Sequence, residues 1–289
     1  MGDVISPLRT LDVESTDNVV LKLHHLGGSG PPLIICHATG FNGMAYGPMA
    51  RYLTGDFDIW AVDFRGHGAS NAPASGDFAW SGMAADLLAC IEAIGAGPVF
   101  AIGHSMGGAT ILHASIIDPT AVRAAYVFEP IVVPKGVDMG GESPLSTGAR
   151  RRRAVFGSRA EAVASYGSRP PLNQLHADAL EAYVEYGFHD TDDGQVELAC
   201  SPEHEALTFE TEDKITVDRL EGSTLPVMVA AGATEDDYSP ADMAIHLAES
   251  YAHAVLARHD ELGHFGPLEA PDSIAREAKQ WFDQQDGTT

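Results

Sequence analysis

A serine between two glycines is the side chain of this sequence best placed for covalent chemistry. The segment Gly103-His-Ser-Met-Gly107 follows the apolar run 99–102, and small and apolar residues continue beyond it to Ala114. This order predicts a strand, a tight turn and a helix, with Ser105 at the turn in a strained backbone conformation. The free N–H groups and the positive end of the helix dipole would then face the serine hydroxyl. Ser105 is therefore predicted to be a nucleophile.

A serine hydroxyl is a weak nucleophile at neutral pH and needs a neighbouring base. The sequence holds 13 histidines, most of them within predicted helices or strands. His264 differs because it stands in Gly263-His-Phe-Gly-Pro267, a predicted loop between the last strand and the last helix. It also comes last in the chain order serine, acid, histidine. We predict that His264 is the base.

Four carboxylates compete for the third role, which is to orient the imidazole and stabilise its protonated form. Glu235, Asp236 and Asp237 stand in one loop after the predicted strand 225–232. Glu129 ends an earlier predicted strand and could reach the same imidazole from the adjacent loop. Asp236 is the first choice and Glu129 the second, and the residues alone leave the identity of the acid open.

Two backbone amides are expected to bind the oxygen that becomes negatively charged during attack on a carbonyl. Met106 follows the nucleophile, so its amide is the first donor. The second is predicted at Thr39, in the loop His37-Ala-Thr-Gly-Phe41 that follows the apolar run 33–36. Small residues let this loop approach a substrate closely, and His37 is expected to support the loop rather than to take part in the chemistry.

The elements that must position these residues alternate in type. Residues 33–130 contain three strand–helix repeats, which predict a parallel sheet with right-handed crossovers. The alternation stops near Pro134, gives way to helical patterns, and resumes after residue 220. We therefore predict a discontinuous core, residues 1–133 and 221–289, with a helical cap at 134–220 inserted between strands of the core.

At this point the chain resembles the α/β-hydrolase fold superfamily. The similarity rests on five segments in the order typical of that superfamily: His37-Ala-Thr-Gly-Phe41, Asp63-Phe-Arg-Gly-His-Gly-Ala-Ser70, Gly103-His-Ser-Met-Gly-Gly108, Phe128-Glu-Pro130 and Gly263-His-Phe265. The resemblance implies a mostly parallel eight-stranded sheet flanked by helices, an inserted helical cap and a serine–histidine–acid triad. Ala38 departs from the pattern, since the superfamily usually has glycine there. The Glu129 segment also resembles relatives that take their acid from that earlier strand, such as haloalkane dehalogenases, whose nucleophile is an aspartate instead of a serine.

The activity expected from this resemblance is hydrolysis of a small carboxylic ester through an acyl-enzyme intermediate. Thioesterase, lactonase, carbon–carbon bond hydrolase and cofactor-free haloperoxidase are alternatives that use the same triad. A ligand-binding or signalling protein that turns over slowly is the alternative from another class. No cofactor and no metal are expected, and the sequence leaves open whether the protein is a monomer or a homo-oligomer.

Composition limits the partners. The chain has 41 acidic and 17 basic residues and a formal charge of −24, which argues against nucleic acid because a phosphate backbone requires a basic face. No apolar run approaches the roughly 18 residues that span a bilayer. We therefore expect a cytoplasmic protein that binds no membrane. Cys36, Cys90 and Cys200 are scattered in apolar segments, which predicts buried free thiols.

One local exception to the acidic composition lies in the predicted cap. The run Arg150-Arg-Arg-Arg153 stands there together with Arg159 and Arg169. It favours a solvated helix face that offsets nearby acidic residues. A binding site for an anionic substrate is the alternative.

Overall fold

Eight strands form one central sheet in the computed structural model, which describes residues 6–234 and 239–287. Their spatial order is β1-β2-β4-β3-β5-β6-β10-β11. The first two strands pair antiparallel and the remaining six run parallel to one another. The bounds are β1 Arg9–Glu14, β2 Val20–Gly27, β3 Pro32–Cys36, β4 Asp58–Asp63, β5 Val99–His104, β6 Val122–Phe128, β10 Val227–Ala231 and β11 Ala254–Arg258. The mostly parallel eight-stranded sheet expected from the sequence is confirmed.

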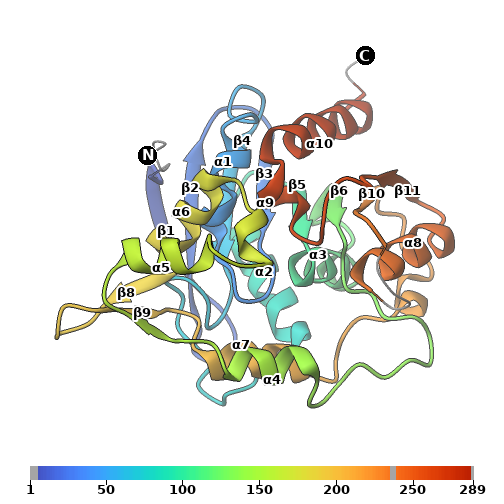
Figure 1. Cartoon of the computed structure of the whole chain (residues 1–289). Helices are drawn as coiled ribbons and strands as arrows, with labels where there is room; N and C mark the ends of the chain where they lie inside the picture. The colour runs from blue at the N-terminus through green and yellow to red at the C-terminus, as the bar shows by residue number, and fades with distance from the viewer. Residues whose placement is uncertain (1–5, 235–238, 288–289) are drawn as a thin grey trace.

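Helices cover both faces of this sheet (Figure 1). One face packs against α2 (Trp80–Ile94), α3 (Met106–Ile117) and α8 (Pro240–Ser250), and the other against η1 (Gly43–Tyr46), α1 (Gly47–Ala50) and α10 (Pro271–Gln285). The apolar run in β3 shows why both faces are needed. Ile34 and Cys36 point into one hydrophobic cluster, whereas Leu33 and Ile35 point into the other. A strand buried on both sides is apolar at every position.

The segment between β6 and β10 leaves the sheet. It contains α4 (Pro144–Arg150), β7 (Val155–Phe156), α5 (Arg159–Tyr166), η2 (Leu172–Gln174), α6 (Ala177–Tyr186), β8 (Phe188–Asp190), β9 (Val196–Leu198), α7 (Pro202–Glu210) and η3 (Val217–Leu220). Figure 1 shows α4 and α7 side by side below the central sheet. The expectation of helices alone was incomplete, because β7, β9 and β8 form a small antiparallel sheet. The predicted limits of the cap, residues 134–220, stay a prediction.

Hydrogen bonds tie this inserted segment to the start of α2. The Asp213 carboxylate accepts the amide hydrogens of Trp80, at 2.7 Å, and of Ser81, at 2.9 Å. Both amides belong to the first turn of α2, where the helix itself offers no acceptor. In return, the indole nitrogen of Trp80 donates to the Thr208 carbonyl of α7 at 3.1 Å. Trp80 therefore packs in the core, as the sequence suggested, and also anchors the inserted segment.

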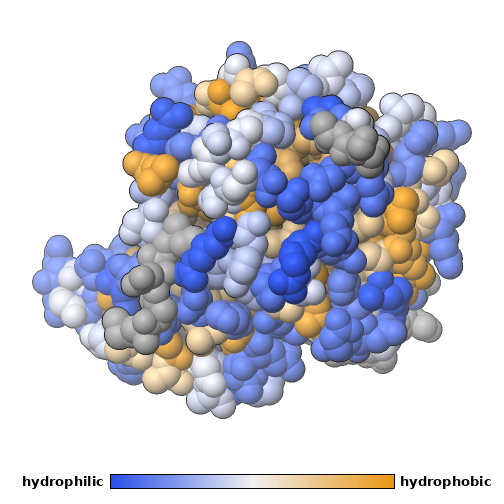
Figure 2. Space-filling model, turned by 90° about the horizontal axis from the view of Figure 1, so that it is seen from above, coloured by the Kyte–Doolittle hydropathy of each residue, from blue (hydrophilic) through white to orange (hydrophobic). Residues whose placement is uncertain are grey.

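The surface reflects the acidic composition. In Figure 2, which shows the molecule from above, hydrophilic side chains cover most of the visible face and apolar residues form only scattered patches. No helix in the described part of the chain is long and apolar enough to span a bilayer. The three cysteines are buried and unpaired, as the sequence predicted.

Candidate active site

Ser105 occupies the sharp turn between β5 and α3. Its backbone has φ 53° and ψ −116°, a region that L-residues rarely adopt and that costs of order 1–3 kcal/mol. Neighbouring backbone explains the flanking glycines, because a Cβ on Gly103 would lie 2.6 Å from the Gly108 Cα and one on Gly107 would collide with the Cys36 carbonyl. The strained turn predicted from the sequence is thus present, with Ser105 at its tip.

Glu129 is the described carboxylate that reaches His264. It follows β6 with a positive φ of 44° and is 2% exposed. Its Oε2 lies 2.6 Å from Nδ1 of His264, and its Oε1 accepts the Gly232 amide hydrogen at 2.8 Å. From the end of β6 the side chain thus reaches Gly232, just after β10, and His264, in the loop after β11. A buried carboxylate held by one backbone amide and one imidazole suits the third role of a triad.

The other three acidic candidates cannot be compared with it in the same way. Asp236, the first choice from the sequence, and its neighbours Glu235 and Asp237 lie outside the described residues. Among the candidates that the structure describes, Glu129 is the one bonded to the imidazole. Its 135-residue separation from His264 is the reason why no local pattern singled it out.

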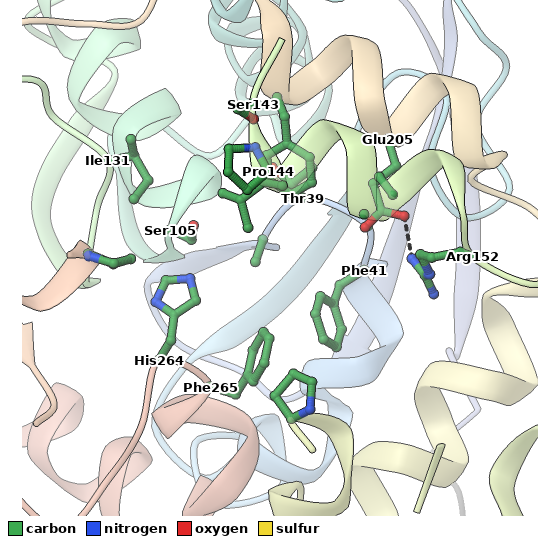
Figure 3. A pocket seen from close by; sticks show the side chains of 18 of the residues that line it. Thr39, Phe41, Ser105, Ile131, Ser143, Pro144, Arg152, Glu205, His264 and Phe265 are labelled. Atoms are coloured by element: carbon green, nitrogen blue, oxygen red, sulfur yellow. Dashed lines mark hydrogen bonds and ion pairs between the residues drawn. The ribbon is translucent and has the colours of Figure 1, made fainter. Parts of the chain in front are cut away.

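His264 stands beside Ser105. Both side chains line the same pocket, and Figure 3 shows the imidazole facing the serine hydroxyl. Since the Glu129 carboxylate can only accept, Nδ1 of His264 carries the hydrogen and Nε2 is left as the basic atom. The His264 side chain is 30% exposed whereas that of Glu129 is 2% exposed, so the base can meet a substrate while its partner stays shielded from water.

The loop after β3 holds the second predicted oxyanion donor. Thr39 lines the pocket close to Ser105, and no acceptor within the described ranges takes up its amide hydrogen. His37 supports this loop, as predicted: Nδ1 donates to the Ala38 carbonyl at 2.8 Å, and Nε2 accepts the Phe64 amide hydrogen at 3.0 Å. Met106 is the first residue of α3, so its amide lacks an intrahelical partner. Both predicted amides therefore border Ser105.

These groups open into a cavity of about 1060 Å³ between the sheet and the inserted segment. Ser105 and His264 lie at one end of it, and an ion pair between Arg152 and Glu205 lies at the other, as Figure 3 shows. Arg152 also donates to the hydroxyl of Tyr183 at 2.6 Å. The pocket thus joins a reacting end to a charged end, with apolar side chains between them.

On the inserted side of this pocket, five cations outnumber the three acidic residues Asp138, Glu142 and Glu205. The cations that line it are Arg151, Arg152, Arg153, Arg169 and Lys214. Arg152 pairs with Glu205 and Arg153 with Glu161. In contrast, Arg151 and Arg169 form no ion pair with any carboxylate in the described part of the chain. The run predicted to be a solvated helix face that offsets acids is therefore mixed, because α4 ends at Arg150, Arg152 is largely buried and Arg151 pairs with none of the described carboxylates.

Sequence reasoning missed two further polar residues at this site. Tyr46 of η1 and His104 of β5 are buried against each other, with the hydroxyl 2.7 Å from Nδ1 of His104. His104 was visible in the sequence only as the unspecified position of Gly-x-Ser-x-Gly, and Tyr46 had no signal at all. Among residues 6–234 and 239–287, no group of three or more His, Cys, Asp or Glu side chains is placed to hold a metal ion.

Comparison with known proteins places this arrangement in context. A family model described as "Alpha/beta hydrolase family" matches residues 33–277. The chain is 25% identical over 272 residues to (E)-2-((N-methylformamido)methylene)succinate hydrolase of Acinetobacter baylyi, covering 89% of this chain and 92% of that protein. It is 27% identical over 219 residues to 2-(acetamidomethylene)succinate hydrolase of Mesorhizobium japonicum, covering 75% and 76%. The crystal structure of an E-2-(acetamidomethylene)succinate hydrolase superposes with a TM-score of 0.77 at 20% identity, over 95% of this chain and all of that one (100%). At that identity the superposition speaks for the fold.

Proposed function

This chain belongs to the alpha/beta hydrolase family, and from that premise we propose that it hydrolyses small carboxylic esters with Ser105 as the nucleophile. The observation that carries the proposal is the 2.6 Å contact between Glu129 and Nδ1 of His264, in the pocket that also holds Ser105. A serine on a strained turn, a base beside it and a buried acid behind the base are the three parts that acyl transfer requires.

The proton moves along a short route in this mechanism. Nε2 of His264 takes the proton of the Ser105 hydroxyl while the oxygen attacks the ester carbonyl. The Glu129 carboxylate stabilises the imidazolium that forms and remains ionised. The imidazolium then gives its proton to the departing alcohol, which leaves an acyl group on Ser105. Water, activated by the same Nε2, attacks this acyl-enzyme and releases the acid.

Two backbone amides stabilise the negative charge that develops during the reaction. In each tetrahedral intermediate the former carbonyl oxygen is negative, and the amides of Thr39 and Met106 donate to it. Removing one donor of this kind typically lowers kcat by about 10²–10³-fold. Met106 begins α3, so the positive end of that helix dipole adds to the stabilisation.

The test uses wild-type protein and the Ser105→Ala variant on a panel of short and medium p-nitrophenyl esters, extended to thioesters and lactones. We expect ester turnover in the wild type and a loss of at least about a thousandfold in the variant, with an unchanged circular dichroism spectrum. Undiminished turnover by the variant would contradict Ser105. A wild type without any rate above background would favour the ligand-binding alternative.

A second candidate substrate is an amide that carries carboxylates. The observation in its favour is the pair Arg151 and Arg169, two cations on the pocket wall that pair with no carboxylate among residues 6–234 and 239–287, in a protein whose net charge is −24. The names of the two relatives describe succinates with an acylamino group. Such a molecule would offer an amide carbonyl to Ser105 and carboxylates to the guanidinium groups, which bind carboxylates well.

Matched substrates separate the two candidates. An ester and an anilide of acetic acid are compared with the corresponding half-ester and half-anilide of succinic acid. The ester proposal expects both esters to be cleaved faster than both anilides, since the alcohol is the better leaving group. The second candidate expects the half-anilide of succinic acid to have a higher kcat/KM than the acetyl ester, and this advantage to fall as salt screens the arginines.

A further inference from the structure

A buried chain of hydrogen bonds joins the Thr39 loop to the His264 loop. The hydroxyl of Tyr46 lies 3.1 Å from the Ala38 amide nitrogen and 2.7 Å from Nδ1 of His104. On its other side, Nε2 of His104 lies 2.8 Å from the carbonyl oxygen of His264. Tyr46 and His104 are each 1% exposed, so water does not compete for these bonds. We call these two side chains the buried relay.

The two ends of the buried relay fix the direction of every bond in it. The Ala38 amide can only donate and the His264 carbonyl can only accept. His104 must therefore carry its hydrogen on Nε2, and its Nδ1 must accept from the Tyr46 hydroxyl. The Tyr46 oxygen in turn accepts from Ala38. All three bonds run the same way, an arrangement in which each bond polarises and strengthens the next.

The relay requires a neutral His104. Burial lowers the pKa of His104 well below its ordinary value, and the nearby His264 acts in the same direction. A proton on Nδ1 would leave the Tyr46 hydroxyl hydrogen without an acceptor in a buried site, which is costly. The ring centroids of His104 and His264 are 5.0 Å apart. Because His104 is neutral, it also does not repel the positive charge of the His264 imidazolium.

At its other end, the buried relay helps to hold the backbone of Ala38 in place. The Ala38 carbonyl accepts from Nδ1 of His37 at 2.8 Å and from the Phe41 amide at 3.1 Å. A peptide bond is planar and trans, so the direction of that carbonyl also sets the opposite direction of the Thr39 N–H. With the Ala38 amide bound to Tyr46, both peptide groups of Ala38 are held. The orientation of the Thr39 donor then follows from its neighbours.

We propose that Tyr46 and His104 are positioning residues that keep the Thr39 amide and the His264 base in register with each other. The inference rests on the proposed function, because it concerns the same acyl transfer. The buried relay touches neither substrate nor the reacting atoms, and it acts through the backbone at both of its ends. A displaced oxyanion donor weakens binding of the transition state more than binding of the substrate, so kcat falls while KM stays nearly constant.

Tyr46→Phe is the central variant, because it removes one hydroxyl and keeps the ring. We expect kcat for a p-nitrophenyl ester to fall about tenfold with KM within about twofold, which is less than the about 10²–10³-fold lost when a whole donor is removed. The rate at which a fluorophosphonate labels Ser105 should fall in proportion to kcat. The affinity for a trifluoromethyl ketone, which forms a tetrahedral adduct, should fall by the same factor. Tyr251→Phe is the matched control: its hydroxyl bonds the Leu225 carbonyl at 2.8 Å outside the pocket, so stability should fall while kcat stays at the wild-type value.

Two changes at His104 test the direction of the bonds. Gln offers one acceptor and one donor, so His104→Gln should retain most of the rate, whereas His104→Leu should lose at least as much as Tyr46→Phe. Equal rates for Gln and Leu would overturn the role assigned to the two ring nitrogens. If His104→Leu does not fold, Tyr46→Phe still decides. A Tyr46→Phe enzyme with wild-type kcat, or with a changed KM alone, would overturn the inference. A wild type that the fluorophosphonate fails to label would instead contradict the proposed function.

Discussion

The two sides of the pocket are built by different means. Its floor, formed by Ser105, His264 and Thr39 with Glu129 behind His264, is held mainly by bonds to the backbone. The Ser105 amide donates to the Phe128 carbonyl at 2.9 Å, and Glu129 accepts from the Gly232 amide. The carbonyl of His264 accepts from His104. Each of these bonds has a main-chain partner, so the floor depends on the strand ends that supply it.

The roof, formed by the arginines and Glu205 of the inserted segment, is held by pairs of charged side chains. Arg150 pairs with Glu203 and Glu210 outside the pocket lining, and Arg152 pairs with Glu205 inside it. The exposed pair of Arg150 with Glu203 contributes only about 0–1 kcal/mol, whereas the largely buried pair of Arg152 with Glu205 is costly to break by removing one partner. A single substitution can therefore change the roof without disturbing the sheet. Under the proposed function, the contrast predicts that the fold sets the reaction, whereas exchangeable side chains of the inserted segment set the choice of substrate.

The largest effect expected from breaking the floor is that of Glu129→Gln. An amide in place of the carboxylate cannot stabilise the imidazolium and favours the wrong tautomer of His264, which in a serine triad costs up to about 10⁴-fold in kcat. We expect kcat/KM for a p-nitrophenyl ester to fall at least about a hundredfold. Glu261 is an exposed carboxylate in the loop that carries His264. Glu261→Gln is therefore the control and should change the rate less than about twofold. A steep loss in Asp236→Asn together with a mild one in Glu129→Gln would assign the acid to the loop after β10.

The floor was largely predictable from the sequence because its special backbone conformations require particular residue types at neighbouring positions. A nucleophile on a strained turn needs small neighbours, and Gly103 and Gly107 meet that requirement. His264 was predicted as the base because it stands in a loop, has glycines nearby and comes last in the chain order serine, acid, histidine. The choice of acid was different, because Glu129 meets His264 only through the order of strands in the sheet. Sequence gives no measure of which strand ends are neighbours, so the acid remained open.

The roof and the buried relay could not be predicted in the same way. β7, β8 and β9 are only two to three residues long, too short for a period-two pattern to appear. The pairing of Arg152 with Glu205 joins residues from two separate helical patterns. Tyr46 lies in a 3₁₀ turn that is followed by one short α-helical turn. Apolar periodicity does not report where a buried hydroxyl finds its partner.

Removing a roof cation should change selectivity rather than chemistry. We expect Arg151→Ala and Arg169→Ala each to lower kcat/KM for a succinyl half-ester by about tenfold, since one charge-assisted bond to a carboxylate is worth roughly 1.5–3 kcal/mol before screening. The acetyl ester should change less than about twofold. Arg219→Ala, which removes an exposed cation outside the pocket lining, controls for the loss of one positive charge. An equal loss on both esters would show that these arginines support the structure of the roof and do not bind an anion.

The smallest expected effect concerns the ion pair between His259 and Glu277, which lies beneath the loop of His264. Nε2 of His259, at the start of the loop that carries His264, lies 2.8 Å from Oε2 of Glu277, which also accepts from the Tyr126 hydroxyl. The bond to Glu277 raises the pKa of His259, and the exposed Glu261 adds to the effect. The pKa of Glu277 is lowered, because the bonds from His259 and Tyr126 outweigh burial.

The signs of these two shifts define a pH window for stability. A raised histidine pKa adds stability that is complete below the unfolded value of about 6.5 and is lost as pH rises through the folded value. A lowered glutamate pKa adds stability above the unfolded value of about 4.3, which is lost as pH falls through the folded value. The pair should therefore stabilise most between about pH 4.5 and 6.5.

Glu277→Gln should lower Tm by a few degrees at pH 5.5 and by less at pH 9, measured by calorimetry. Tyr126→Phe removes an uncharged hydroxyl from the same oxygen and should lower Tm similarly at both values. A Tm loss in Glu277→Gln that does not vary with pH would show that the pair acts as a neutral hydrogen bond.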